Sequence, residues 1–216
     1  MADEASAVQS PAVSPVVSPI ADPAPLGLAA FALTTFLLSA KNANWMSHSS
    51  GLTFLSYAFA YGGICQLLAG MWEFRNRNVF GATAFATYGG FWIGVYFYIQ
   101  DVGGGLLGKG EFALFNHDLG WILLSFAVFN TYMLLMSTQV SLAVFGVFLT
   151  LELTEIVGAI ANFEAGAHAT PTGLVKVSGY IGILTAIVAW YTSAAGVANG
   201  MGGRLRLPVG KPLLTP

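Results

Sequence analysis

The chain has 216 residues, of which 56% are hydrophobic and only 8% are charged, against about 25% charged residues in a typical soluble domain. So few charges cannot cover a water-facing surface, which excludes an ordinary soluble domain, a disordered chain and a coiled coil. The net charge of −2 gives no footprint for nucleic acid, and the single cysteine, Cys65, excludes an internal disulfide and a thiolate metal cluster. Composition therefore favours an all-α integral membrane protein, in which the 26 glycines let helices approach closely.

The first 22 residues predict a disordered tail. Pro11, Pro15 and Pro19 recur every four residues among Ser, Ala and Val, a pattern that forms neither a helix nor a core. No Lys or Arg precedes Lys41, whereas the start of a cleavable signal peptide carries positive charge. We therefore expect no signal peptide and an exposed, flexible segment over residues 1–22.

Charged residues divide the rest of the chain into apolar blocks, each long enough for the roughly 20 residues that cross a bilayer as a helix. The block 119–151 has no charged residue and is too long for one span, but polar residues from Ser137 to Ser141 divide it. We expect a membrane domain over residues 23–203 and a cytoplasmic tail over residues 204–216. The six predicted spans cover residues 24–41, 51–72, 79–100, 118–138, 141–163 and 175–197.

An even number of spans places both termini on one side of the membrane. If that side is cytoplasmic, the inner segments hold all four arginines, and basic residues there outnumber those in the outer loops. The inner residues are Arg75, Arg77, Arg204, Arg206 and Lys211, and the outer ones are Lys41, Lys109 and Lys176. The positive-inside rule thus favours a multi-pass protein of the cell (plasma) membrane with cytoplasmic N- and C-termini.

The first predicted span opens with a proline-rich segment at residues 22–28, DPAPLGL. Prolines fit the first turn of a helix, where backbone N–H groups have no partner within the helix, and Asp22 is well placed as an N-cap. A polar helix end beside a pore mouth also attracts small anions. The candidate residues for that mouth are Asp22, Pro23, Pro25, Leu26 and Gly27.

This segment resembles the N-P-A-P-L-G-L signature of the acetate uptake transporter family, the succinate–acetate permeases and their fungal relatives, with Asp22 in place of Asn. Residues 61–74 (YGGICQLLAGMWEF), residues 78–92 (NVFGATAFATYGGFW) and residues 207–210 (LPVG) continue the resemblance in the family's order. The similarity covers residues 22–211.

The resemblance implies six transmembrane helices per subunit, a homohexamer with a separate pore through each protomer, and transport of acetate, succinate or related short carboxylates. It also implies a narrow apolar constriction halfway along the pore, formed by Phe31, Tyr88 and Leu151. Phe31 and Tyr88 are assigned from the family's motifs. Leu151 is assigned by matching the fifth span to the family without gaps through residues 159–162. An apolar ring dewets readily and so gates ions, and the Tyr88 hydroxyl could hand a carboxylate across it.

Several predicted helices carry hydroxyl or amide groups on the same face as small residues. Lipid would leave these polar atoms without hydrogen bonds, so such faces either pack against another helix or line a polar path. The spacing leaves both interpretations open. The candidates for binding a carboxylate are Thr34, Thr35, Gln66, Thr87 and Asn162.

Glu152 and Glu155 lie inside the fifth predicted span, where an ionisable residue suggests a function. The family that the chain resembles usually has hydroxyl or apolar residues there. Helical spacing places Glu155 on the face of Leu151 and Asn162, and Glu152 about 60° away. Repulsion between the two carboxylates and their desolvation in the membrane should keep at least one of them protonated. A protonated carboxyl group could donate a hydrogen bond to acetate or relay a proton. Alternatively, Glu152 bonds a neighbouring helix.

Several function classes can be compared on these residues. A passive anion channel and a proton-coupled monocarboxylate symporter both remain open, as does a structural membrane protein that transports nothing. The chain lacks the cluster of catalytic residues at membrane depth that a membrane enzyme needs. It also lacks the mid-helix lysine that a retinal photoreceptor needs. His48, His117 and His168 are too widely spaced for a metal site. We expect no metal, no cofactor and no nucleic acid, with short carboxylates and the bilayer as partners.

Overall fold

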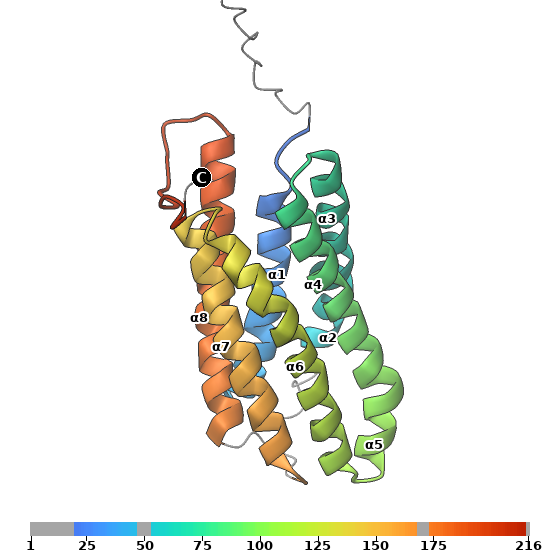
Figure 1. Ribbon diagram of the computed structural model, residues 1–216. Helices are drawn as coiled ribbons and strands as arrows, with labels where there is room; N and C mark the ends of the chain where they lie inside the picture. The colour runs from blue at the N-terminus through green and yellow to red at the C-terminus, as the bar shows by residue number, and fades with distance from the viewer. Residues whose placement is uncertain (1–19, 47–52, 168–172, 215–216) are drawn as a thin grey trace, which may run out of the picture.

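The computed structural model describes residues 20–46, 53–167 and 173–214. Within these ranges all regular structure is helical and forms six long segments side by side (Figure 1), which confirms the predicted fold class. The predicted tail lies outside the described residues except for residues 20–22, as do His48 and His168. The segments are α1 (Ala24–Asn42); α2 (Phe54–Tyr57), η2 (Ala58–Cys65) and α3 (Gln66–Arg75); α4 (Val79–Phe97), η3 (Tyr98–Gly103) and α5 (Gly104–Gly108); α6 (Phe112–Ser137); α7 (Leu142–Ala165); and α8 (Gly173–Gly200).

The predicted break between the fourth and fifth spans is confirmed. Helix α6 ends at Ser137 and α7 begins at Leu142, where the Ser141 hydroxyl accepts a hydrogen bond from the Val144 N–H at 3.2 Å and so caps the new helix. The third segment is longer than predicted, because α4 continues through η3 and α5 to Gly108. The segments η2 and η3 are π-helical, which the sequence pattern did not predict.

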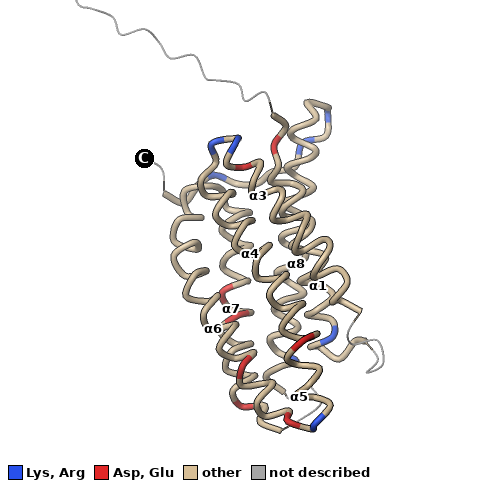
Figure 2. Tube along the Cα trace, turned by 90° about the vertical axis from the view of Figure 1, so that its right-hand side faces the viewer, with Lys and Arg blue, Asp and Glu red and all other residues tan. Residues whose placement is uncertain are grey.

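Five of the six segments in the described chain are long and apolar enough to cross a membrane: α1, α2–η2–α3, α6, α7 and α8. The remaining segment, α4, is rich in Gly, Thr and Tyr, and nine of its 19 helical residues are buried by the protein itself. Helix α4 packs mainly against α3 and η2, at one side of the bundle (Figure 1). Most charged residues lie toward the two ends of the bundle (Figure 2).

Glycines set the closest helix contacts. A Cβ atom at Gly89 of α4 would lie 2.7 Å from the backbone nitrogen of Leu67 in α3, and one at Gly179 of α8 would lie 2.5 Å from the backbone nitrogen of Ala43 beyond α1. Only residues without a side chain permit backbones to approach this closely. These contacts join α3 to α4 and α1 to α8, and so fix the helices that carry Phe31 and Tyr88.

The C-terminal segment folds back onto the bundle instead of hanging free as a tail. The Tyr191 hydroxyl donates to the Pro208 carbonyl at 2.6 Å, and the Ala143 N–H in the first turn of α7 donates to the Val209 carbonyl at 2.8 Å. Gly210, with a φ of +74°, turns the chain against Leu142. The closing motif therefore satisfies a donor at the start of α7 that the helix itself leaves unpaired.

Adjacent glycines in α4 provide a matched test of this packing. Gly89→Ala forces a Cβ atom against the Leu67 backbone and should lower the free energy of unfolding by about 1–3 kcal/mol. Gly90→Ala meets no described atom within 4 Å and should be neutral or stabilising by up to about 1 kcal/mol, because alanine favours helix. Thermal unfolding of both variants in detergent measures the difference. Equal destabilisation would contradict the close approach of α3 and α4.

Candidate functional site

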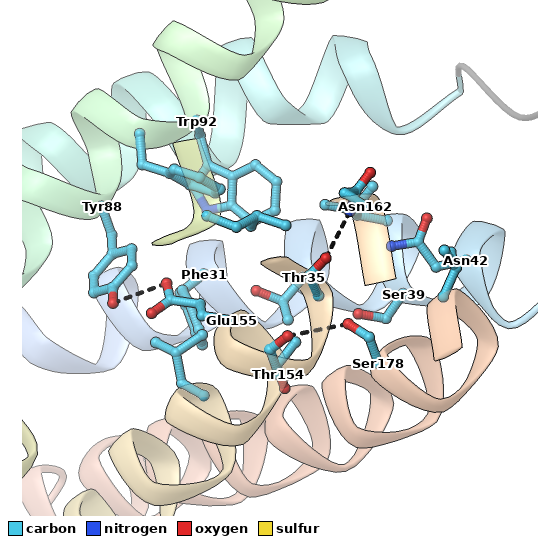
Figure 3. Close-up of a pocket in the computed structure, with 16 residues that line it drawn as sticks. Phe31, Thr35, Ser39, Asn42, Tyr88, Trp92, Thr154, Glu155, Asn162 and Ser178 are labelled. Carbon is cyan, nitrogen blue, oxygen red and sulfur yellow. Dashed lines mark hydrogen bonds between the residues drawn. The ribbon is translucent and has the colours of Figure 1, made fainter. Parts of the chain in front are cut away.

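A polar cavity of about 70 Å³ lies within the bundle, between α1, α4, α6, α7 and α8 (Figure 3). One water needs about 10–15 Å³ of such space, so the cavity has room for a molecule with a few non-hydrogen atoms. Its wall combines aromatic and aliphatic side chains with hydroxyl, amide and carboxyl groups. The lining residues are Phe31, Thr35, Leu38, Ser39, Asn42, Tyr88, Phe91, Trp92, Leu123, Leu151, Thr154, Glu155, Gly158, Asn162, Val175 and Ser178.

A second, smaller cavity of about 20 Å³ lies on the side of Leu28, Gln66 and Phe148. Three side chains line both cavities and thus form the wall between them: Phe31, Tyr88 and Leu151. The Phe31 and Tyr88 rings meet edge to face with their centroids 5.8 Å apart, and all three residues are buried. The structure therefore brings the three predicted constriction residues together, and we call them the apolar ring.

Three buried polar atoms on the wall of the polar cavity have no hydrogen-bond partner among the described residues. They are the Thr35 hydroxyl, the indole nitrogen of Trp92 and the Glu155 Oε2 atom. An unpaired buried polar group costs about 1–3 kcal/mol, so proteins keep such groups mainly where a ligand or water uses them. Their convergence on one cavity indicates a binding site that supplies two donors and a carboxyl oxygen.

The Tyr88 hydroxyl is occupied by protein groups and is not free to contact a passing carboxylate. It lies 3.1 Å from Asn130 Oδ1 of α6 and 3.1 Å from Glu155 Oε1 of α7. The Asn130 side-chain nitrogen in turn donates to the Phe148 carbonyl at 2.9 Å and to Glu152 Oε2 at 2.7 Å. The expected hand-over by Tyr88 is therefore replaced by a buried network that joins α4, α6 and α7.

The two glutamates take the different positions that helical spacing predicts. Glu155 lines the polar cavity beside the apolar ring (Figure 3), and its side chain is 3% exposed. Glu152 points toward α6, where its carboxyl also accepts from the Thr131 hydroxyl at 2.7 Å. Of the pair, only Glu155 can contact a molecule in the cavity.

The polar candidates divide into two groups. Thr35 and Asn162 line the polar cavity, and Gln66 lines the smaller one with its Oε1 atom unpaired among the described residues. Thr34 instead bonds the Ala30 carbonyl at 3.0 Å and packs against η2, and Thr87 lines neither cavity.

The signature segment lies at the N-terminal end of α1. Its last residue, Leu28, lines the smaller cavity, whereas the five candidate pore-mouth residues, from Asp22 to Gly27, line neither cavity. The helix begins at Ala24, as predicted for the first span, but its N-cap position is Pro23 and not Asp22. The Asp22 carboxylate still accepts from the Ala24 N–H at 2.9 Å. The Pro25 carbonyl accepts from Ser193 of α8 at 2.6 Å, which ties the segment to the last helix.

Several residues of the site were not among the predicted site residues, and Trp92 and Asn130 matter most for its hydrogen bonds. Trp92 lies one helical turn beyond Tyr88 on the same face of α4, and this spacing could have found it. Asn130 is fully buried within the uncharged block of α6, where an amide in an otherwise apolar stretch was the available signal.

The fold and site define a class: a polytopic helical membrane protein whose single chain encloses two cavities separated by an apolar ring. Residues 5–211 match the GPR1/FUN34/yaaH family, and the chain belongs to that family. The polar cavity, the ring and the glutamates all lie within the matched region.

Relatives of the chain include transport proteins from fungi and bacteria. The chain is 39% identical over 197 residues to acetate permease A of Emericella nidulans, covering 88% of this chain and 65% of that protein. It is 32% identical over 192 residues to the succinate-acetate/proton symporter SatP of Escherichia coli K12, covering 88% of this chain and 96% of that protein. The chain thus spans slightly less than two thirds of the fungal permease.

A solved structure shares the architecture. The structure of the bacterial acetate channel SatP superposes with a TM-score of 0.75 at 30% sequence identity, covering 88% of this chain and 99% of that one. The likeness extends over nearly the whole of that bacterial protein.

Neighbouring threonines distinguish a ligand role from a packing role. Thr35→Val removes an unpaired buried hydroxyl and should leave the unfolding temperature unchanged or higher. Thr34→Val removes the hydrogen bond to the Ala30 carbonyl and should cost about 1 kcal/mol. Thermal unfolding of the two variants decides this. A large loss of stability in Thr35→Val alone would show that its hydroxyl supports the fold.

Proposed function

We propose that the chain forms a transmembrane pathway for acetate and related short carboxylic acids, succinate included. The observation that carries this is the apolar ring, because the same three side chains separate two cavities inside one chain. The larger cavity presents unpaired donors at Thr35 and Trp92, which suit carboxyl oxygens. The names of the related acetate permease and acetate channel support the same substrate class.

The mechanism has two candidates, a passive channel and a proton-coupled symporter. One bacterial relative is named a symporter, and the solved bacterial protein is named a channel. An enclosed apolar ring suits either, because a small molecule passes such a ring by side-chain motion or by shedding its water. Glu155 at the cavity wall supplies an ionisable group that a proton-linked mechanism needs.

We also propose a homohexamer in the plasma membrane with both chain ends cytoplasmic and no catalytic activity. The described chain enters α1 and leaves α8 at the same end of the bundle (Figure 1), and α3, which ends at Arg75, ends there too. Arg77, Arg204 and Arg206 follow these helix ends within a few residues, which fits a cytoplasmic side. Each protomer contains its own pair of cavities, so assembly is not needed to build the pathway. Native mass measurement in mild detergent tests the assembly, and a monodisperse monomer would contradict it.

Uptake of labelled acetate into vesicles containing the purified protein tests the function. Uptake should exceed that of protein-free vesicles and should be reduced by excess unlabelled acetate or succinate. Trp92→Phe, which removes one unpaired donor, should lower the uptake, whereas Trp72→Phe changes an exposed side chain and should not. Uptake equal to that of protein-free vesicles would favour a structural role.

The apolar ring predicts the size selectivity. Phe31→Ala or Leu151→Ala removes apolar bulk from the wall and should raise the uptake of larger carboxylates relative to acetate several-fold. Leu149→Ala, two residues away on α7 with a 39% exposed side chain, is the control and should retain the original ratio. Competition between labelled acetate and longer carboxylates measures the uptake of larger carboxylates relative to acetate. An unchanged ratio in Phe31→Ala and Leu151→Ala would remove the ring from the selectivity mechanism.

A further inference from the structure

The orientation of Asn130 is fixed by its surroundings. Its side-chain nitrogen lies 2.9 Å from the Phe148 carbonyl, which is solely an acceptor, so the amide must turn its N–H groups to that side. The same nitrogen donates to Glu152 Oε2 at 2.7 Å. Both of its hydrogens are therefore used, and the Oδ1 atom is left facing the Tyr88 hydroxyl as an acceptor.

Tyr88 has one hydroxyl hydrogen and two oxygen neighbours, each at 3.1 Å. Tyr88 can donate to only one of them, and Asn130 Oδ1 cannot donate back. Whichever oxygen accepts the Tyr88 hydrogen, the other contact lacks a hydrogen unless Glu155 is protonated and supplies a second one. An ionised Glu155 would leave two oxygen lone pairs facing each other in a buried site, which is costly.

We propose that Asn130 is a positioning residue that holds a proton on Glu155, so that the polar cavity receives the undissociated carboxylic acid rather than the carboxylate anion. The transport consequence rests on the proposed function, whereas the protonation of Glu155 does not. The proton of Glu155 points to Tyr88, and Oε2 remains as a neutral acceptor at the cavity wall.

The hydrogen-bonding pattern of the cavity matches that acid. A carboxylate has acceptors only, whereas an undissociated carboxyl group has one O–H donor and a carbonyl acceptor. The cavity offers donors at Thr35 and Trp92 for the carbonyl oxygen and the acceptor Oε2 of Glu155 for the O–H. An anion would leave the Glu155 acceptor unpaired and would face its oxygen lone pairs.

The charged and titratable groups around Glu155 come from three elements. Tyr88 of α4 contacts it directly, Glu152 lies one turn away on α7, and Tyr132 of α6 interacts electrostatically with Tyr88. The residues of α1 and α8 that line the same cavity are uncharged. Among the described residues lining the cavity, no cation is present to balance an ionised Glu155 or to attract an anion.

Infrared spectroscopy of the purified protein tests the protonation directly. The C=O stretching band of a protonated carboxyl group should be present at pH 7 and should lose intensity in Glu155→Gln, which assigns it. In Asn130→Leu the Tyr88 hydrogen becomes free to stabilise the Glu155 anion, so the band at pH 7 should be weaker than in the parent protein. Because that variant leaves Glu152 Oε2 without its donor, the double variant Asn130→Leu/Glu152→Gln is measured as well.

Thr131→Val is the matched control, because Thr131 is the next residue on α6 and contacts Glu152 without contacting Tyr88. It should leave the Glu155 band and its titration unchanged. Absence of the band at pH 7 in the parent protein would overturn the proposal. So would an equal weakening of the band in Thr131→Val and Asn130→Leu, since the effect would then come from Glu152 alone.

Transport measurements test the substrate form. An acetate gradient across vesicles should acidify the receiving side faster than in protein-free vesicles without generating a current. Glu155→Gln replaces the carboxyl group by an amide that does not titrate, so its uptake should lose part of the dependence between pH 5 and pH 8 that the parent protein shows. A current that reverses at the acetate equilibrium potential would overturn the proposal and still support the proposed function. No uptake at all would reject the proposed function and leave the infrared result standing.

Discussion

Inside a bilayer no water replaces a missing hydrogen-bond partner, and this constraint determines how the centre of the molecule is built. Tyr88, Asn130 and Glu152 come from three helices and satisfy one another's buried polar atoms. Tyr88 is also one side of the apolar ring. The hydrogen bonds that hold α4 against α6 and α7 therefore also hold the ring in place, so packing and gating share the same side chains.

The polar cavity shows where this constraint is relaxed. Thr35, Trp92 and Glu155 each keep a buried polar atom that has no hydrogen-bond partner among the described residues. A fold retains such a cost mainly at a site of function, and compensates for it with good packing elsewhere. Close glycine contacts such as that of Gly179 with the end of α1 supply this packing, because they keep the helices near enough to exclude water from the rest of the bundle.

The sequence predicted those features that depend on local patterns. Spacing of charged residues located six helical segments and the break after Ser137, and helical periodicity placed Glu155 and Glu152 on different faces. The sequence could not predict that Asn130 accepts a hydrogen bond from the Tyr88 hydroxyl. These residues are 42 positions apart, and only the packed bundle brings them together. The docking of the C-terminal segment on α7 is non-local in the same way.

The carboxyl group of Glu155 shows how a membrane pathway can keep an ionisable residue at its wall. An ionised carboxylate there would be a buried charge, and no cation among the described residues lining the cavity balances it. A protonated carboxyl group, by contrast, keeps the site neutral and still offers one donor and one acceptor, as a hydroxyl does. Asn130 favours the protonated form, because its Oδ1 atom cannot donate to Tyr88, and only a proton on Glu155 supplies the second hydrogen that the two contacts of Tyr88 need.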